Sequence, residues 1–216
     1  MISTLPPQCR PGLISPECNA DQSPMPAPYR QHLTELEAPS GALVFYGAID
    51  RADLPDDCPG HWQRDASDPG SVFISISREG DGRAPKGQAT VIASVFTTPE
   101  GWFSSSEPEY QSKKKACQAK IRNEVEAALG LSDHTWRHQE LATPRGFLRW
   151  TGRPNGIVGG LGQSPSRFGP FGLASRTPMR GLWLCGDSIH PGEGTAGVTL
   201  SALMACRQLL AQRGQT

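Results

Sequence analysis

GLWLCGDSIHPGEGTAGVTLSA, at residues 181–202, is the stretch of sequence that decides the fold. Its apolar run from Leu182 to Cys185 ends at a Gly-Asp pair, a loop rich in glycine and proline follows, and a long apolar segment begins near Thr195. This order predicts a strand, a loop and a helix. The first backbone N–H groups of such a helix lack intrahelical partners, and the positive end of the helix dipole lies behind them. The stretch therefore predicts a position suited to an anion or a polarised carbonyl group.

The glycines of this loop allow two interpretations. Gly192, Gly194 and Gly197 carry no side chain, so a flat or phosphorylated ligand can approach the backbone closely. A tight strand-to-helix connection without any ligand explains the same glycines, and spacing alone leaves both interpretations open. Two nucleotide motifs are excluded, because no Lys-Ser or Lys-Thr follows the glycines as in a P-loop, and no acidic residue follows Gly197 as in a dinucleotide fingerprint.

The stretch resembles the C-terminal FAD-binding motif of the carotenoid desaturase and isomerase family, whose members are related to phytoene desaturase and the flavin amine oxidases. Four short motifs upstream are similar to sequences of the cyanobacterial branch that includes the C-3',4' desaturase. These motifs are TPRGF at 143–147, GRP at 152–154, GG at 159–160 and RFGPFG at 167–172. The resemblance is strong over residues 143–210, loose over 27–142 and poor over 6–26. It implies an FAD-dependent oxidoreductase that desaturates or isomerises a carotenoid.

The resemblance also implies which residues bind the cofactor. The family's aspartate hydrogen-bonds the ribityl chain of FAD, and its loop and helix start approach the pyrimidine edge of the flavin. The implied FAD-binding residues are Gly186, Asp187, Gly194, Thr195, Ala196 and Gly197. A helix N-terminus at that edge stabilises the negative charge that reduction places on the flavin.

No catalytic acid or base can be assigned from the sequence. Asp187, Ser188 and His190 lie within four residues of one loop and cannot form the geometry of a hydrolase triad. We expect His190 to cap or pack the loop. Glu193 is expected to orient the flavin, to pair with an arginine, or to remain an exposed carboxylate near the helix start.

The resemblance predicts an α+β fold that is the C-terminal fragment of a two-domain, flavin amine oxidase-like protein. Residues 1–26 are expected to be irregular, apart from a short strand at 2–5 that belongs to the FAD-binding domain. Residues 27–142 are expected to form the substrate domain, and residues 143–216 the C-terminal portion of the FAD-binding domain. Family members begin with a strand and a G-x-G-x-x-G turn, and residues 1–60 contain no such motif. We therefore expect the N-terminal Rossmann βαβ unit to be missing.

Periodicity and turn residues predict the elements between these ends. Strands are expected at 41–49, 71–77 and 88–97 in an antiparallel sheet, with a weak strand at 134–142 and a polar loop at 50–69. Helices are expected at 27–37, 107–129 and 195–212. Ser106 and Glu109 form a capping box for the second helix, and Gly130 follows its end. The last helix is apolar nearly all round, so it needs cover on several sides, which indicates a missing partner domain.

Charge and composition limit the classes of partner. The 21 Lys and Arg balance 21 Asp and Glu, which gives no support for a nucleic-acid partner. Residues 141–186 contain no acidic residue but carry six arginines, which either pair with acidic groups of residues 107–140 or of an absent half, or contact FAD phosphates or anionic lipids. These arginines are Arg145, Arg149, Arg153, Arg167, Arg176 and Arg180. The lysines at 113–115 and Lys120 predict a solvated face, with a membrane surface as the alternative.

The cysteines and the apolar runs of the sequence allow predictions about metal binding and cellular location. The six cysteines show no C-x-x-C pair and no cluster with histidines, so we expect reduced thiols and no metal site. Cys185 and Cys206 lie in apolar runs and are expected to be buried. No signal peptide or membrane-spanning run is present, which predicts a cytoplasmic protein that is not secreted and at most peripheral on a thylakoid or plasma membrane.

Two hypotheses on function follow from the resemblance. In the first, the chain is part of an enzyme with FAD as cofactor and a carotenoid as substrate. In the second, the chain is an inactive fragment, or an associating half that binds FAD only with a separate N-terminal FAD-binding polypeptide. A peripheral membrane surface is the other expected partner.

Overall fold

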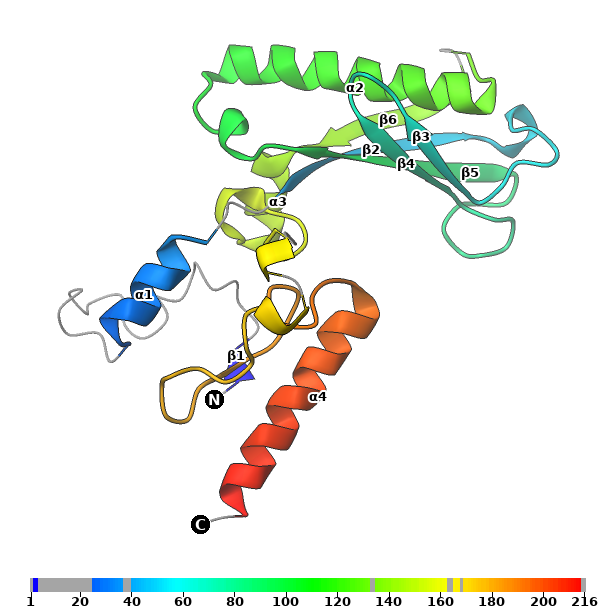
Figure 1. Cartoon of the computed structure of the whole chain (residues 1–216). Helices are drawn as coiled ribbons and strands as arrows, with labels where there is room; N and C mark the ends of the chain where they lie inside the picture. The colour runs from blue at the N-terminus through cyan, green and yellow to red at the C-terminus, as the bar shows by residue number, and fades with distance from the viewer. Residues whose placement is uncertain are drawn as a thin grey trace. The chain divides into compact units, whose positions relative to one another are not determined.

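The structure, a computed structural model, describes residues 2–3, 25–36, 40–132, 135–162, 165–167 and 169–214 (Figure 1). It forms two compact units. The split unit consists of Met1–Ser40 together with Val158–Thr216, and the sheet unit consists of Gly41–Ile157. Residues 27–40 thus lie in the split unit and residues 143–157 in the sheet unit, whereas the sequence placed the domain boundaries at 27 and 143. The assignment of a substrate domain and an FAD-binding domain stays a prediction.

Within the described residues, five strands of the sheet unit form one antiparallel sheet in the order β3-β4-β5-β2-β6. The strands are β2 (Gly41–Asp50), β3 (His61–Asp65), β4 (Ser71–Ile76), β5 (Gln88–Thr97) and β6 (Trp136–Ala142). The predicted α+β class and antiparallel sheet are confirmed. The predicted loop at 50–69 is wrong in part, because β3 and a short 3-10 helix, Arg51–Asp53, lie within it. β3 gives no clear strand signal because it is an edge strand with mainly exposed polar side chains. Its Trp62 is partly buried and packs against the core.

Helix α2 (Glu107–Leu129) covers one face of this sheet (Figure 1). Every second residue of β5, from Ala89 to Val95, is buried in a core that also includes Ile121 and Val125 of α2. This alternation follows from the pleat, since successive side chains of a strand point to opposite faces. The opposite face carries exposed apolar side chains of β2, β4 and β5, namely Tyr46, Phe73 and Phe96.

The ends of α2 agree with the prediction from local sequence. Ser106 and Glu109 form the capping box, with the Ser106 N–H donating to Glu109 Oε2 at 2.9 Å. Gly130 ends the helix in a left-handed conformation, with φ of 67°. The lysine face is partly used within the chain, because Lys113 donates to the carbonyl of Gly101 and Lys120 pairs with Asp68.

Helix α3 (Pro144–Thr151) follows β6 and was not predicted as a helix. Pro144 occupies its first turn, and Gly152 ends it at a φ of 68°. A Cβ on Gly156 would lie 1.8 Å from the carbonyl oxygen of Pro144, so only glycine allows this turn to pack against the start of α3. The motif at 143–154 is therefore a short helix followed by a tightly packed turn.

The split unit contains β1 (Ile2–Ser3), α1 (Ala27–Thr34), β7 (Trp183–Leu184) and α4 (Gly194–Arg213). β1 pairs in parallel with β7, although the two strands are far apart in sequence. The predicted strand at 2–5 is confirmed at residues 2–3, and the predicted helix at 195–212 is confirmed. The helix predicted at 27–37 is confirmed from its start but ends earlier, at Thr34. Short 3-10 turns lie at Pro165–Arg167 and Gly169–Phe171 in this unit, and at Glu100–Trp102 and Pro154–Gly156 in the sheet unit.

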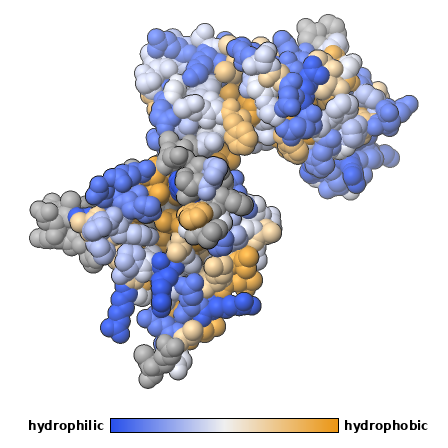
Figure 2. All heavy atoms as spheres, in the orientation of Figure 1, coloured by the Kyte–Doolittle hydropathy of each residue, from blue (hydrophilic) through white to orange (hydrophobic). Residues whose placement is uncertain are grey.

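Helix α4 is covered on one side by residues of its own unit. Ala205 is fully buried in a cluster with Trp183 and Cys185, whereas Leu200 and Leu203 remain 46% and 50% exposed. Apolar side chains are visible along α4 in Figure 2. The prediction that Cys206 is buried is wrong, because it lies on the exposed side of the helix. Cys185 is buried as predicted, and Cys9 and Cys18 lie outside the described residues.

Candidate cofactor site at the start of helix α4

The turn at Gly186 and Asp187 is tied to helix α4. Gly186 adopts a φ of 121°, and its N–H donates to Oγ of Ser201 at 2.9 Å. Ser201 is fully buried and belongs to α4. The carbonyl of Gly186 accepts the N–H of Ile189 at 3.2 Å, which closes the turn. The strand end and the helix start are thus held in a fixed relation by hydrogen bonds.

The glycines of this loop have different surroundings in the structure. A Cβ on Gly197 would lie 2.5 Å from the carbonyl oxygen of Gly192, so internal packing accounts for Gly197. Gly194 has a φ of 79°, and no atom lies within 4 Å of the position that its Cβ would take. Gly194 therefore combines a left-handed backbone with open space, which is the arrangement that lets a ligand reach the backbone.

The start of α4 is open to solvent. Glu193 occupies the N-cap position, and in the described part of the chain no side chain forms a capping hydrogen bond there. Residues 193–196 are exposed. Because the first N–H groups of a helix have no intrahelical acceptor, this end presents donors and a partial positive charge outward.

The Glu193 side chain does not cap the helix and instead forms a hydrogen bond with a neighbouring turn. Its Oε1 accepts the N–H of Gly160 at 2.8 Å. A Cβ on Gly159 would lie 2.8 Å from the same oxygen, and a Cβ on Gly160 would lie 2.2 Å from the carbonyl oxygen of Asp187. Glu193 Oε1 is thus used by the backbone of this turn, and the expected pairing of Glu193 with an arginine stays a prediction. The paired glycines fit between Asp187 and Glu193, a role that the sequence analysis did not predict.

Asp187, Ser188 and His190 do not form a catalytic triad. Oγ of Ser188 donates to Oδ1 of Asp187 at 3.3 Å. The backbone N–H of His190 donates to the carbonyl of Leu173 at 2.9 Å, which ties the loop to that residue. Asp187 is half-buried, with its carboxylate at the strand end where the resemblance places the ribityl contact.

The arginines of residues 141–186, the segment without acidic residues, have different surroundings in the two units. In the sheet unit, Arg145 pairs with Glu107 at 3.0 Å and lies over the ring of Tyr110, which confirms the predicted pairing with residues 107–140. In the split unit, Arg167 and Arg176 line a pocket. No group of histidine, cysteine, aspartate or glutamate side chains in the described residues is arranged to hold a metal ion. No described helix is both long enough and apolar enough to span a membrane.

The chain is similar to curated prolycopene isomerases. It is 31% identical over 192 residues to "Prolycopene isomerase, chloroplastic" of Arabidopsis thaliana and to prolycopene isomerases 1 and 2 of an Oncidium hybrid cultivar. The enzyme of Daucus carota is 30% identical over the same length. This similarity to carotenoid isomerases extends over 83% of the chain. The resemblance seen in the sequence is thereby confirmed, although no family model matches the chain.

The alignments cover 83% of this chain and 30–32% of each relative. The chain therefore spans about a third of the length of the curated relatives it matches. The FAD contacts at Gly186, Asp187 and residues 194–197 stay predictions.

Proposed function

We propose that this chain contributes the flavin end of the FAD site of an oxidoreductase that desaturates or isomerises carotenoids. The single observation that carries the proposal is the exposed, uncapped start of α4 directly after the strand and the Gly186-Asp187 turn. We assign Asp187 to the ribityl chain, and residues 194–197 to the pyrimidine edge of the flavin.

The residues present fit such a group. The open space at Gly194 admits a planar ring against the backbone. Backbone donors at a helix start favour negative charge without reorganising, because the dipoles are fixed beforehand. When bound, FAD supplies the redox chemistry, and the residues of this chain bind and orient it.

A polyene substrate fits the open face of the sheet unit. Tyr46 pairs with Ile92 across β2 and β5, and Phe73 pairs with Ser94 across β4 and β5. Tyr46, Phe73 and Phe96 are exposed to 39%, 45% and 79% on this face. A carotenoid is long and apolar, so burial of its surface against such side chains is the main available source of affinity. We therefore place the substrate on this face, in keeping with the prolycopene isomerases among the relatives.

We also propose that the split unit is part of a larger, flavin amine oxidase-like FAD-binding domain. Parallel strands are normally buried within larger sheets, yet β1 and β7 form a two-stranded parallel pair among the described residues. Trp183 is 3% exposed, and its Nε1 atom has no hydrogen-bond partner among the described residues. Both features fit a sheet that continues on a further βαβ unit.

The second candidate function is that of an associating half without activity of its own. The exposed leucines of α4 favour it, because a helix with an apolar outer side is normally covered. In this case the chain binds FAD only together with a separate FAD-binding polypeptide. We propose no membrane contact from the lysines of α2, because Lys113 and Lys120 already contact groups of the chain.

The test is to titrate the purified chain with FAD and to follow flavin absorption at about 450 nm and flavin fluorescence. We expect saturable binding, which Asp187→Ala weakens by about tenfold or more, since a hydrogen bond to a charged group contributes roughly 1.5–3 kcal/mol. Asp57→Ala is the matched control, because Asp57 is an exposed aspartate of the sheet unit. Equal affinity of the Asp187→Ala variant and the unaltered chain would show the assigned contact to be wrong. A chain that binds no FAD supports the associating half over the independent enzyme.

A further inference from the structure

The split unit contains a second hollow, separate from the start of α4. A pocket of about 460 Å³ lies between α1 and residues 167–176. It shares no lining residue with the proposed FAD contacts at Gly186, Asp187 and 194–197. Its volume is within the range of sites for small molecules. Leu36, Phe171 and Leu173 give it an apolar side.

Arg167 lines this pocket, and one nitrogen of its guanidinium group has no acceptor among the described residues. Its Nη1 atom is buried, and no acceptor in the described residues lies within hydrogen-bond distance of it. A guanidinium group stays protonated under all ordinary conditions and can only donate. A buried donor without an acceptor destabilises a protein by about 1–3 kcal/mol, and more when it is charged. The arrangement therefore favours an acceptor supplied by a ligand.

The other charges around the pocket favour an anion. Arg176 and His32 contribute to the lining, and Arg176 is exposed, so its guanidinium is free to turn toward a ligand. Glu35 is the one carboxylate in the described lining, and its Oε1 already accepts Nε2 of Gln31 at 2.7 Å. The absence of acidic residues from 141 to 186 leaves the two arginines without a partner of opposite charge nearby in sequence.

A phosphate group suits this lining. Two guanidinium forks can each form parallel hydrogen bonds to its oxygens, and phosphate offers enough acceptors for both. The exposed ring of Phe171 and the side chain of Leu36 suit an apolar or aromatic body attached to that phosphate.

We propose that this pocket binds a phosphate group carried on an apolar or aromatic body, with Arg167 and Arg176 holding the phosphate. The phosphate can come from a soluble organic phosphate or from a phospholipid headgroup. The proposal does not rest on the FAD site or on the carotenoid function, because different residues form the pocket.

The experiment measures binding of three probes to the full chain. Calorimetry follows pyrophosphate and ADP, and cosedimentation follows vesicles of phosphatidylglycerol in phosphatidylcholine. We expect at least one probe to bind, and Arg167→Gln and Arg176→Gln each to weaken it about tenfold or more. Binding of ADP or pyrophosphate identifies a soluble source, and binding of the vesicles alone identifies a headgroup. Either result supports the site.

The matched control is Arg180→Gln, because Arg180 is an exposed arginine of the same acid-free segment that does not line the pocket. An equal loss in Arg180→Gln and Arg176→Gln would overturn the proposal in favour of unspecific charge attraction, as would a chain that binds none of the probes. Circular dichroism checks that Arg167→Gln folds, and the exposed Arg176 provides the decisive variant if it does not. Asp187→Ala should leave phosphate binding unchanged while it weakens FAD binding, which separates this site from the proposed function.

Discussion

At the residue scale, the fit of Gly160 against the Gly186-Asp187 turn leads to a prediction about stability. A Cβ at this position would lie 2.2 Å from a backbone oxygen, which cannot move as a flexible side chain could. We expect Gly160→Ala to lower the free energy of unfolding by at least about 2 kcal/mol, as measured by urea denaturation. It should also release the hydrogen bond from Gly160 to Glu193, which amide hydrogen exchange detects.

The control for this substitution is Gly146→Ala. Gly146 lies in α3, and no atom lies within 4 Å of the position that a Cβ would take there, so alanine should be neutral or stabilise by up to about 1 kcal/mol. If both variants unfold at the same urea concentration, the close approach at Gly160 does not matter for stability.

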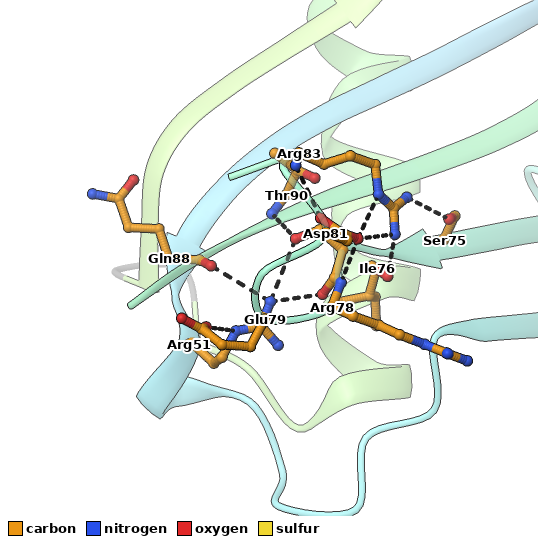
Figure 3. A network of polar contacts seen from close by, with 10 residues as sticks. Arg51, Ser75, Ile76, Arg78, Glu79, Asp81, Arg83, Gln88 and Thr90 are labelled. Atoms are coloured by element: carbon orange, nitrogen blue, oxygen red, sulfur yellow. Dashed lines mark hydrogen bonds and ion pairs between the residues drawn. The ribbon is translucent and has the colours of Figure 1, made fainter. Parts of the chain in front are cut away.

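At the element scale, the connection between β4 and β5 is organised by one carboxylate (Figure 3). Asp81 accepts the backbone N–H of Arg78 at 2.7 Å and that of Arg83 at 2.9 Å, and it pairs with the Arg83 guanidinium. These interactions, with the two backbone hydrogen bonds foremost, lower the pKa of Asp81 to about 2. The carboxylate thus replaces backbone partners that the turn itself does not supply.

The pH dependence of this connection follows from the sign of the shift. Because the folded pKa lies below the unfolded value, the stabilisation is fully present above about pH 4 and is lost as the pH falls toward about 2. Asp81→Asn should lower stability at neutral pH and flatten the dependence between these values, as followed by urea denaturation at a series of pH values. Asp57→Asn should keep the slope of the unaltered chain. A slope in Asp81→Asn equal to that in the unaltered chain would show that Asp81 is not the titrating group.

Sequence predicts elements best where the signal is local. The capping box of α2 joins residues three apart, and the strands at 71–77 and 88–97 alternate clearly, so all three are predictable. β3 carries few apolar residues because it is an edge strand, and α3 is only eight residues long, so neither has a readable periodicity. At the candidate site, the strand, loop and helix were predictable. The hydrogen bond from Gly160 to Glu193 was not, because it joins residues 33 positions apart.

At the scale of the whole molecule, the split unit is built from two segments of the chain, one before and one after the sheet unit in sequence. The first segment contributes β1 and α1, and the last contributes β7 and α4. In sequence, the sheet unit is therefore an insertion between the two segments of the split unit. The chain spans about a third of the length of the prolycopene isomerases it matches, and the exposed leucines of α4 are the surface on which we proposed that an associating polypeptide binds.

The exposed side of α4 therefore leads to the last prediction. Leu203 and Leu210 are 50% and 66% exposed, so Leu203→Gln and Leu210→Gln should change the free energy of unfolding of the chain by no more than about 0.5 kcal/mol. Leu209 packs against the cluster of Trp183, Cys185 and Ala205, and Leu209→Gln is the control that should destabilise. The exposed leucines should instead matter for association. Both exposed variants should reduce the binding of a dye that reports apolar surface, and weaken complex formation with a coexpressed N-terminal FAD-binding segment. Strong destabilisation by Leu203→Gln would mean that this side of α4 is covered by the chain itself, and the case for a partner on that surface would fall.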